Sequence, residues 1–152
     1  MTKPITVCVQ ILDHASDLPL PHYQTQGAAG MDLYAAIADT VIVQPMQRLL
    51  IPTGLKLALP KATEAQIRPR SGLALNHGLT VLNAPGTIDC DYRGEVKILL
   101  INLGQDDVEI NHGMRIAQLV IASVLQASLI PVIDLDTTER GAHGFGSTGT
   151  SI

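Results

Sequence analysis

The stretch Leu49–Leu59, LLIPTGLKLAL, holds two short apolar runs that are separated by Pro52, Thr53 and Gly54. Runs of this length bounded by turn residues are typical of strands. The pattern recurs along the whole chain, which contains 13 Gly and 9 Pro. The runs that we interpret as strands are Thr6–Leu12, Thr40–Val43, Leu49–Ile51, Leu55–Leu59, Thr80–Leu82, Val96–Ile101 and Val108–Ile110. Short strands at this spacing predict an all-β sandwich, jelly roll or barrel.

One longer apolar segment, Gly113–Ala127, fits a helix as well as a strand. Its apolar residues recur at helical spacing, but a strand buried on both faces is also continuously apolar, so periodicity does not decide. The β-branched side chains of Ile116, Val120 and Val124 favour a strand. We expect only one short helical turn, at Ser71–Asn76.

Composition and charge describe one globular domain without a general attraction for polyanions. The 152 residues are 46% hydrophobic and carry a formal net charge of −4, which does not favour a nucleic-acid backbone or an anionic membrane surface. No apolar run approaches the roughly 20 residues that span a bilayer. Met1–Asp13 lacks the features of a signal peptide, and Cys8 and Cys90 form neither a CxxC motif nor a disulfide framework. We therefore expect a reduced, cytoplasmic protein that binds neither nucleic acid nor membrane.

The apolar pattern stops after Ile133. A segment without apolar residues at regular spacing has no core of its own to hold it. The sequence therefore predicts a β-rich core at residues 1–133 and a flexible C-terminal arm at residues 134–152.

The arm contains the sequence RGAHGFGSTG, Arg140–Gly149. Its glycines allow backbone N–H groups to converge on phosphate oxygens, and Arg140, Ser147 and Thr148 add donors. Phe145 is the only Phe of the chain, and in so polar a segment we interpret it as a ring that stacks on a planar ligand. The alternative is a disordered Gly/Ser tail without a ligand.

Arg70 and Ser71 precede the expected helical turn, where free N–H groups favour an anion. An ordinary Ser cap beside a solvated Arg is an equally good interpretation of these two residues alone. Asp32 and Gln118 lie in otherwise apolar stretches, and a structural hydrogen bond is the first expectation for such groups.

The longest polar cluster is Asn83–Glu95, NAPGTIDCDYRGE. A Pro-Gly pair followed by alternating residues predicts a hairpin, with Asp89, Asp91 and Tyr92 close to its mouth. The backbone of such a hairpin offers donors and acceptors to a base edge. Asp91 and Arg93 are interpreted as solvated turn residues, whereas Asp89, beyond a Gly turn and beside an apolar residue, favours a functional role.

Taken together and in this order, five segments resemble the trimeric dUTPase family. They are AGMDL at 29–33, PRSGL at 69–73, NAPGTIDCDYRGE at 83–95, GMRIAQL at 113–119 and RGAHGFGSTG at 140–149. The resemblance implies a jelly-roll-like subunit, a distorted barrel of the β-clip type, in a homotrimer. Three active sites would lie at subunit interfaces, and the arm of one subunit would close a site formed by the other two. It also implies that Gly113–Ala127 is a strand.

The resemblance further implies hydrolysis of dUTP to dUMP and pyrophosphate. Asp89 would activate the water that attacks the α-phosphorus, and Tyr92 would lie under the deoxyribose and exclude a ribose 2′-hydroxyl. The residues that would bind uracil are Asn83, Gly86, Thr87 and Ile88, with Phe145 covering the base. The residues that would bind phosphates are Arg70, Ser71, Gly72, Gln118, Arg140, Gly146, Ser147 and Thr148. Mg2+ would be held mainly by the triphosphate and water, with Asp32 and Gln118 beyond the waters.

Two other functions are weighed against this one. A dCTP deaminase shares the fold, but its catalytic Glu would fall at Leu99, inside an apolar run. A non-catalytic nucleotide sensor or structural trimer would have no use for both Asp89 and the Arg140–Gly149 segment. Hydrolysis of dUTP is therefore the preferred hypothesis.

Overall fold

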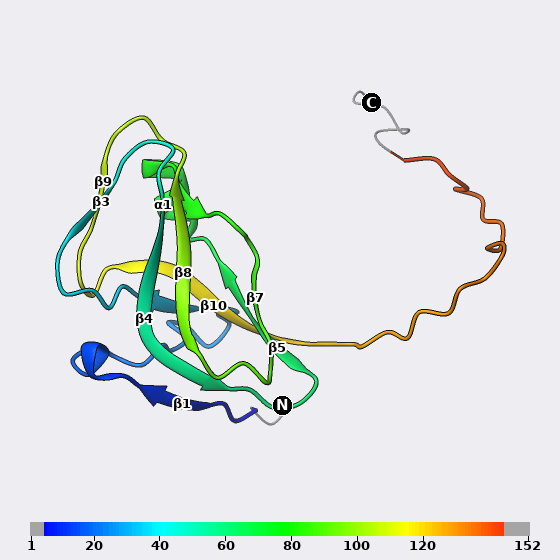
Figure 1. Cartoon of the computed structure of the whole chain (residues 1–152), viewed down its shortest axis with the longest axis horizontal. Coiled ribbons are helices and arrows are strands. Elements are labelled where there is room, and N and C mark those ends of the chain that lie inside the picture. The colour runs from blue at the N-terminus through cyan, green and yellow to red at the C-terminus, as the bar shows by residue number, and fades with distance from the viewer. Residues whose placement is uncertain (1–4, 145–152) are drawn as a thin grey trace.

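The computed structural model describes residues 5–144, and these form ten strands, one short helix and one 3-10 turn (Figure 1). The elements are β1 (Cys8–Ile11), η1 (Asp13–Ala15), β2 (Met31–Tyr34), β3 (Val41–Val43), β4 (Arg48–Ala58), β5 (Thr63–Arg68), α1 (Ser71–His77), β6 (Leu79–Val81), β7 (Gly86–Ile88), β8 (Glu95–Asn102), β9 (Val108–Ile110) and β10 (Arg115–Ser123). The predicted all-β, jelly-roll-like fold is confirmed. No helix of the described residues is long and apolar enough to cross a membrane.

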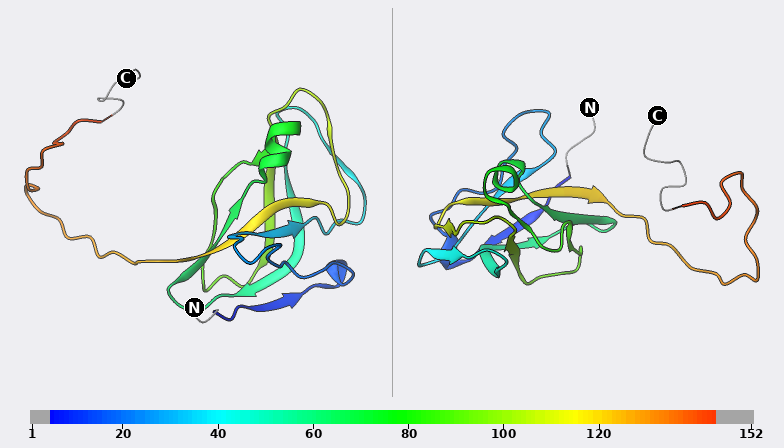
Figure 2. Two further views of the ribbon diagram at one scale, coloured as in Figure 1. Left: turned by 180° about the vertical axis from the view of Figure 1, so that it is seen from behind. Right: turned by 90° about the horizontal axis from the view of Figure 1, so that it is seen from above.

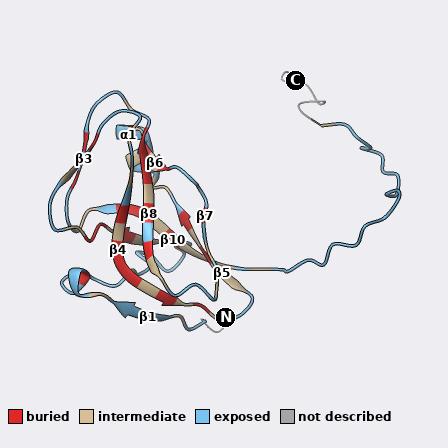
Figure 3. Cartoon of the chain, in the orientation of Figure 1, coloured by how far each residue is buried: buried red, intermediate tan, exposed pale blue. Residues whose placement is uncertain are grey.

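The strands form two four-stranded sheets and one pair. The orders are β1-β4-β8-β6, β2-β10-β5-β7 and β3-β9, and all pairs are antiparallel. Side chains from both four-stranded sheets, such as Ile98, Leu100, Ile67 and Leu119, meet in one buried cluster. The core therefore lies between these sheets, and Figures 2 and 3 show the strands crossing around it.

The two apolar runs of Leu49–Leu59 belong to one long strand, β4, rather than to two strands. Its pairing with β8 shifts between Pro52 and Lys56, which is a bulge of the kind that tolerates a Pro without an N–H. Gly54 occupies this bulge with a φ of 68°, a conformation that favours glycine. The break in the sequence thus bends a strand instead of ending it.

The ambiguous segment Gly113–Ala127 contains strand β10, as predicted. β10 pairs with β2 on one side and β5 on the other, so its backbone donors and acceptors are satisfied by the sheet. The predicted helical turn is α1, which ends at Gly78 in the left-handed region, with φ 66°. The sequence did not predict strands β2 and β5, and β7 lies in the first arm of the hairpin that it predicted at Asn83–Glu95.

The hairpin predicted at Asn83–Glu95 is wrong in its pairing. β7 pairs with β5, whereas β8 pairs with β4 and β6, so the two arms of the supposed hairpin belong to different sheets. The loop of residues 89–94 therefore passes from one sheet to the other. The physical reason is that the polar strand β5 provides an edge for β7, which local turn signals do not reveal.

The N–H of Val124 donates to the carbonyl of Ala62 at 2.9 Å, and beyond this residue the chain leaves the body of the molecule (Figures 1 and 2). Every residue from Pro131 to His143 is exposed. The boundary between core and arm at residues 133 and 134 stays a prediction. Phe145, Gly146, Ser147 and Thr148 lie outside the described residues.

Candidate active site

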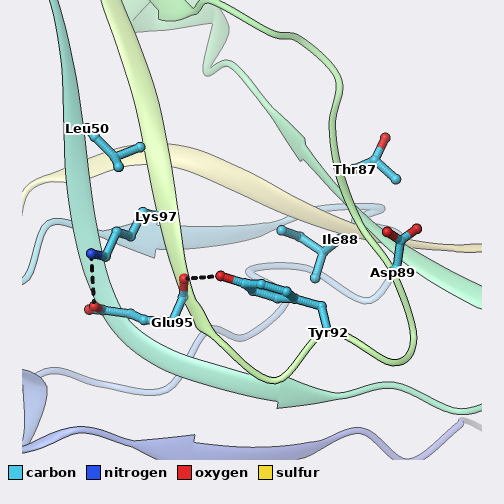
Figure 4. A pocket seen from close by; sticks show the side chains of 7 residues that line it. All are labelled: Leu50, Thr87, Ile88, Asp89, Tyr92, Glu95 and Lys97. Carbon is cyan, nitrogen blue, oxygen red and sulfur yellow. Dashed lines mark hydrogen bonds and ion pairs between the residues drawn. The ribbon is translucent and has the colours of Figure 1, made fainter.

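A pocket of about 470 Å³ opens beside the loop that joins β7 to β8 (Figure 4). It is lined by Leu50, Thr87, Ile88, Asp89, Tyr92, Glu95 and Lys97. The structure therefore brings together four of the predicted site residues, Thr87, Ile88, Asp89 and Tyr92. Leu50, Glu95 and Lys97 were missed by the sequence analysis.

The loop is fixed by its own hydrogen bonds. The N–H of Tyr92 donates to the carbonyl of Asp89 at 3.1 Å. The Arg93 guanidinium donates to the carbonyls of Cys90 and Tyr92 at 2.7 and 2.9 Å. Arg93 therefore braces the loop from outside, while the exposed carboxylate of Asp89 stays at the rim of the pocket.

β7 contributes Thr87 and Ile88 to the same pocket. Within the described residues it pairs only with β5, so its other edge presents unpaired donors and acceptors. Gly86 is buried, and a Cβ built there would lie 3.2 Å from Ile67 and 3.4 Å from the amide nitrogen of Asn83. The predicted uracil-binding residues Asn83 and Gly86–Ile88 are thus neighbours in space.

A second polar cluster joins three elements and centres on Asp32 of β2. Its Oδ1 lies 2.9 Å from Nε of Arg70, and its Oδ2 lies 3.3 Å from Nη1 of Arg115. Arg70 also donates to the carbonyl of Arg115 at 3.1 Å. Gln118 of β10 donates to the carbonyl of Pro69 at 2.8 Å.

This second cluster leads directly into α1. Ser71 and Gly72 form its first turn, and both are exposed. Arg70, the residue before the helix, makes no side-chain cap bond to it. Arg70, Ser71, Gly72 and Gln118 therefore share one end of the molecule, and Arg115 joins them although the sequence analysis gave it no role.

The pocket beside Asp89 and the polar cluster around Asp32 lie at opposite ends of β5. Ile88 pairs with Ala65 and Gly86 pairs with Ile67, so Asp89 continues toward the start of β5, whereas Arg70 lies beyond its end. At about 3.3 Å per residue, roughly 15–20 Å of backbone separates Asp89 from Arg70. Arg140 joins neither cluster, because it lies in the arm and donates to the carbonyl of His143 at 3.0 Å.

The part of the chain that the structure describes contains no group of three or more His, Cys, Asp or Glu side chains suited to a metal ion. The carboxylate of Asp32 is engaged by two guanidinium groups. This donor set suits an anion such as a phosphate chain rather than a bare cation.

Comparison with known proteins agrees with this arrangement. A sequence model of the dUTPase family matches residues 16–149. The chain is 57% identical to the deoxyuridine 5′-triphosphate nucleotidohydrolase of Methylocella silvestris, over 99% of this chain and 96% of that protein. It is 59% identical to the protein of that name from Bartonella henselae, over 97% of this chain and 85% of that protein.

A solved structure shows the same fold. The Staphylococcus bacteriophage 80alpha dUTPase with dUPNHPP superposes with a TM-score of 0.84 at 26% identity, and the match covers 95% of this chain and 99% of that one. The family match spans most of the sequence, and it includes both polar clusters. This chain therefore belongs to the dUTPase family.

Proposed function

We propose that the protein hydrolyses dUTP to dUMP and pyrophosphate, with Asp89 as the general base for water attack on the α-phosphorus. The observation that carries this proposal is the position of Asp89, an exposed carboxylate at the rim of a pocket. A positioned carboxylate that takes a proton from water contributes typically about 10²–10⁴-fold to the rate. The reaction keeps uracil out of DNA and supplies dUMP for thymidylate synthesis.

The nucleoside occupies the pocket beside the β7–β8 loop. Asn83 and the free edge of Gly86–Ile88 read the uracil, because backbone groups matched to uracil leave the amino group of cytosine facing a donor. Tyr92 lies under the deoxyribose. Phe145 covers the base, and Gly146 binds phosphate.

The triphosphate is bound by the cluster around Arg70. Ser71, Gly72 and Gln118 complete that side of the site, while Arg140, Ser147 and Thr148 of the arm bind the far end of the phosphate chain. The ion pair between Arg70 and Asp32 supports this assignment, since a held guanidinium presents its remaining donors in a fixed direction.

Mg2+ fits as a partner of the substrate. Oxygen atoms of the triphosphate and water satisfy this ion, and Asp32 and Gln118 would hold its waters. When bound, the ion neutralises charge on the phosphate oxygens.

A homotrimer with shared active sites follows from the separation of the two clusters. One nucleotide cannot reach both Asp89 and Arg70 of a single chain across roughly 15–20 Å of strand while its α-phosphate is attacked. In a closed ring of copies, Asp89 of one copy meets Arg70 of its neighbour. The segment that follows β10 favours association too, because its large apolar residues are 61–100% exposed. They are Leu125, Leu129, Ile130, Val132, Ile133 and Leu135.

We also infer that the protein works in the reduced cytoplasm. Both cysteines, Cys8 and Cys90, are free, and free thiols persist in a reducing compartment.

A substrate panel tests the reaction. Pyrophosphate release is measured with Mg2+ and, in turn, dUTP, dCTP, dTTP and UTP, and ammonia release is followed in the dCTP sample. We expect rapid turnover of dUTP alone. Binding of dUTP without turnover would instead support a sensor, and ammonia from dCTP would support a deaminase.

Mixed assemblies test the shared site. Arg70→Ala and Asp89→Asn should each be inactive alone, whereas co-expression of the two chains should restore roughly one quarter of the sites, because that fraction combines an intact Arg70 with an intact Asp89 from a neighbour. The oligomeric mass of each sample is measured by light scattering. No recovery in a mixed trimer would show that each site belongs to one chain.

A further inference from the structure

The ring of Tyr92 is seated on the backbone of the loop that follows it. Its hydroxyl donates to the carbonyl of Glu95 at 3.2 Å (Figure 4). A Cβ built on Gly94 would lie 2.9 Å from Cε2 of the ring, and closer still to Cζ and the hydroxyl oxygen. The ring can therefore occupy this position only because residue 94 has no side chain.

Glu95 is in turn fixed by the bulge of β4. Oε1 of Glu95 accepts the N–H of Gly54 at 2.9 Å. Gly54 lies where the β4–β8 register shifts, so the Glu95 side chain takes the place of a missing sheet hydrogen bond. The Glu95 side chain is only 15% exposed. Loss of its carboxylate would leave the N–H of the buried Gly54 without an acceptor, which lowers stability.

His14 contacts the same carboxylate oxygen of Glu95. Its Nε2 lies 2.7 Å from Oε1 of Glu95, although the two residues are 81 positions apart. The turn η1 that carries His14 is anchored to the same bulge, because Ala15 is 1% exposed and packs on Gly54. The N–H of Leu12 also donates to the carbonyl of Gly54 at 2.8 Å.

These contacts link η1 to Tyr92 through Glu95: the Glu95 carboxylate contacts His14 and Gly54, and its backbone carbonyl accepts the Tyr92 hydroxyl. We propose that Gly94 and Glu95 are positioning residues that set the discrimination between deoxyribose and ribose, and that His14 acts through Glu95. The inference rests on the proposed function, in which Tyr92 lies under the sugar. A ring that excludes one hydroxyl group has to be held to within about 0.5 Å, which requires support from surrounding residues.

Gly94→Ala is the most direct test. The added methyl group displaces the Tyr92 ring, and we expect the ratio of kcat/KM for dUTP to kcat/KM for UTP to fall about 10-fold or more. Gly27→Ala is the matched control, because a Cβ at Gly27 meets nothing within 4 Å. Thermal unfolding of both variants shows whether the fold is retained.

Glu95→Ala and His14→Ala test the rest of these contacts, and they decide the matter if Gly94→Ala does not fold. Each should lower the same ratio by a few fold, and the double variant should be no worse than the more affected single variant, since the two residues act in series. His112→Ala is the control, because His112 belongs to another His–carboxylate pair, 3.0 Å from Asp17. It should leave the ratio unchanged.

The outcomes separate this inference from the proposed function. If the wild-type protein does not turn over dUTP, the proposed function fails. If it does, and folded Glu95→Ala and Gly94→Ala keep the wild-type ratio of kcat/KM for dUTP to kcat/KM for UTP, only the positioning role fails. Equal losses on dUTP and UTP would also overturn it, because they indicate a general loosening of the site.

Discussion

The guanidinium of Arg70 is held against the carboxylate of Asp32, with Nε 2.9 Å from Oδ1. Arg115 takes the second carboxylate oxygen, at 3.3 Å. The Asp32 side chain is 15% exposed, whereas Arg115 is 49% exposed, so solvent screens the Arg115 contact more strongly. The pair of Asp32 and Arg70 is therefore the less screened of the two contacts.

Asp32→Asn should weaken binding of a non-hydrolysable dUTP analogue by about 10-fold, in line with the loss of a partly exposed charge-assisted hydrogen bond. Binding of dUMP, which lacks the outer phosphates, should change little. Calorimetry with both ligands measures the difference, and Asp39→Asn, at an exposed position, is the control. Equal weakening of both ligands would show that Asp32 does not act through the phosphate site.

Asp89→Asn should lower kcat by about 10²–10⁴-fold, because the amide cannot accept the proton of the attacking water. Nucleotide binding should persist, since the pocket loop is held by hydrogen bonds that do not use the Asp89 side chain. Single-turnover kinetics separates the chemical step from binding. Asp107→Asn, an exposed acidic residue in the β8–β9 loop, serves as control, and near-normal turnover of Asp89→Asn would refute the role of Asp89.

Apolar runs predicted most strands because burial on a sheet leaves a direct signal in the sequence. β5 was missed because its sequence TEAQIR is mostly polar, yet Ala65 and Ile67 alternate with exposed or half-buried neighbours. That alternation is the signal for a strand with one buried face, and a small Ala makes it faint. Because β5 was not predicted, the true partner of β7 was unknown. β7 was therefore paired with the segment that follows it in the sequence, which gave the wrong hairpin.

The site was predicted only as far as its local segments. Asp32 and Arg115 are 83 residues apart, and so their ion pair depends on the pairing of β2 with β10. Glu95 was missed as well, because its contacts come from distant segments: Gly54 lies in the bulge of β4 and His14 lies in η1. Local patterns identify which residues carry chemistry, but tertiary contacts decide which of them meet.

Thr53→Val should destabilise the fold by about 1–3 kcal/mol, the cost of leaving a buried polar group without its partner. The Thr53 hydroxyl is buried and donates to the carbonyl of Val96 at 2.6 Å, inside the β4 bulge. Valine keeps the shape and removes the donor. Urea unfolding measures the change, with the exposed Thr87→Val as control, and a loss no larger than the control would contradict this account of the bulge.

The pair of Asp17 and His112 gives a pH-dependent prediction. The hydrogen bond from His112 lowers the pKa of Asp17. A lowered carboxyl pKa contributes stability above the ordinary carboxyl range, and that contribution is lost as the pH falls through the lowered value. In His112→Ala the pKa of Asp17 should return toward its ordinary value, as followed by NMR titration of the carboxyl carbon. An unchanged titration would show that His112 is not the cause.

Deletion of Arg140–Ile152 should abolish turnover, a fall of about 10²-fold or more, because the donors of the arm would no longer hold the triphosphate in place. The melting temperature should stay within about 2 °C of the full-length value, since the described residues of this segment contribute little buried surface. Activity assays and thermal unfolding of the same preparation give both numbers. Restoring activity with added wild-type arms in mixed trimers would confirm that the arm acts on a neighbouring copy. A large drop in melting temperature would instead make the arm part of the folded core, and the loss of turnover would then say nothing about phosphate binding.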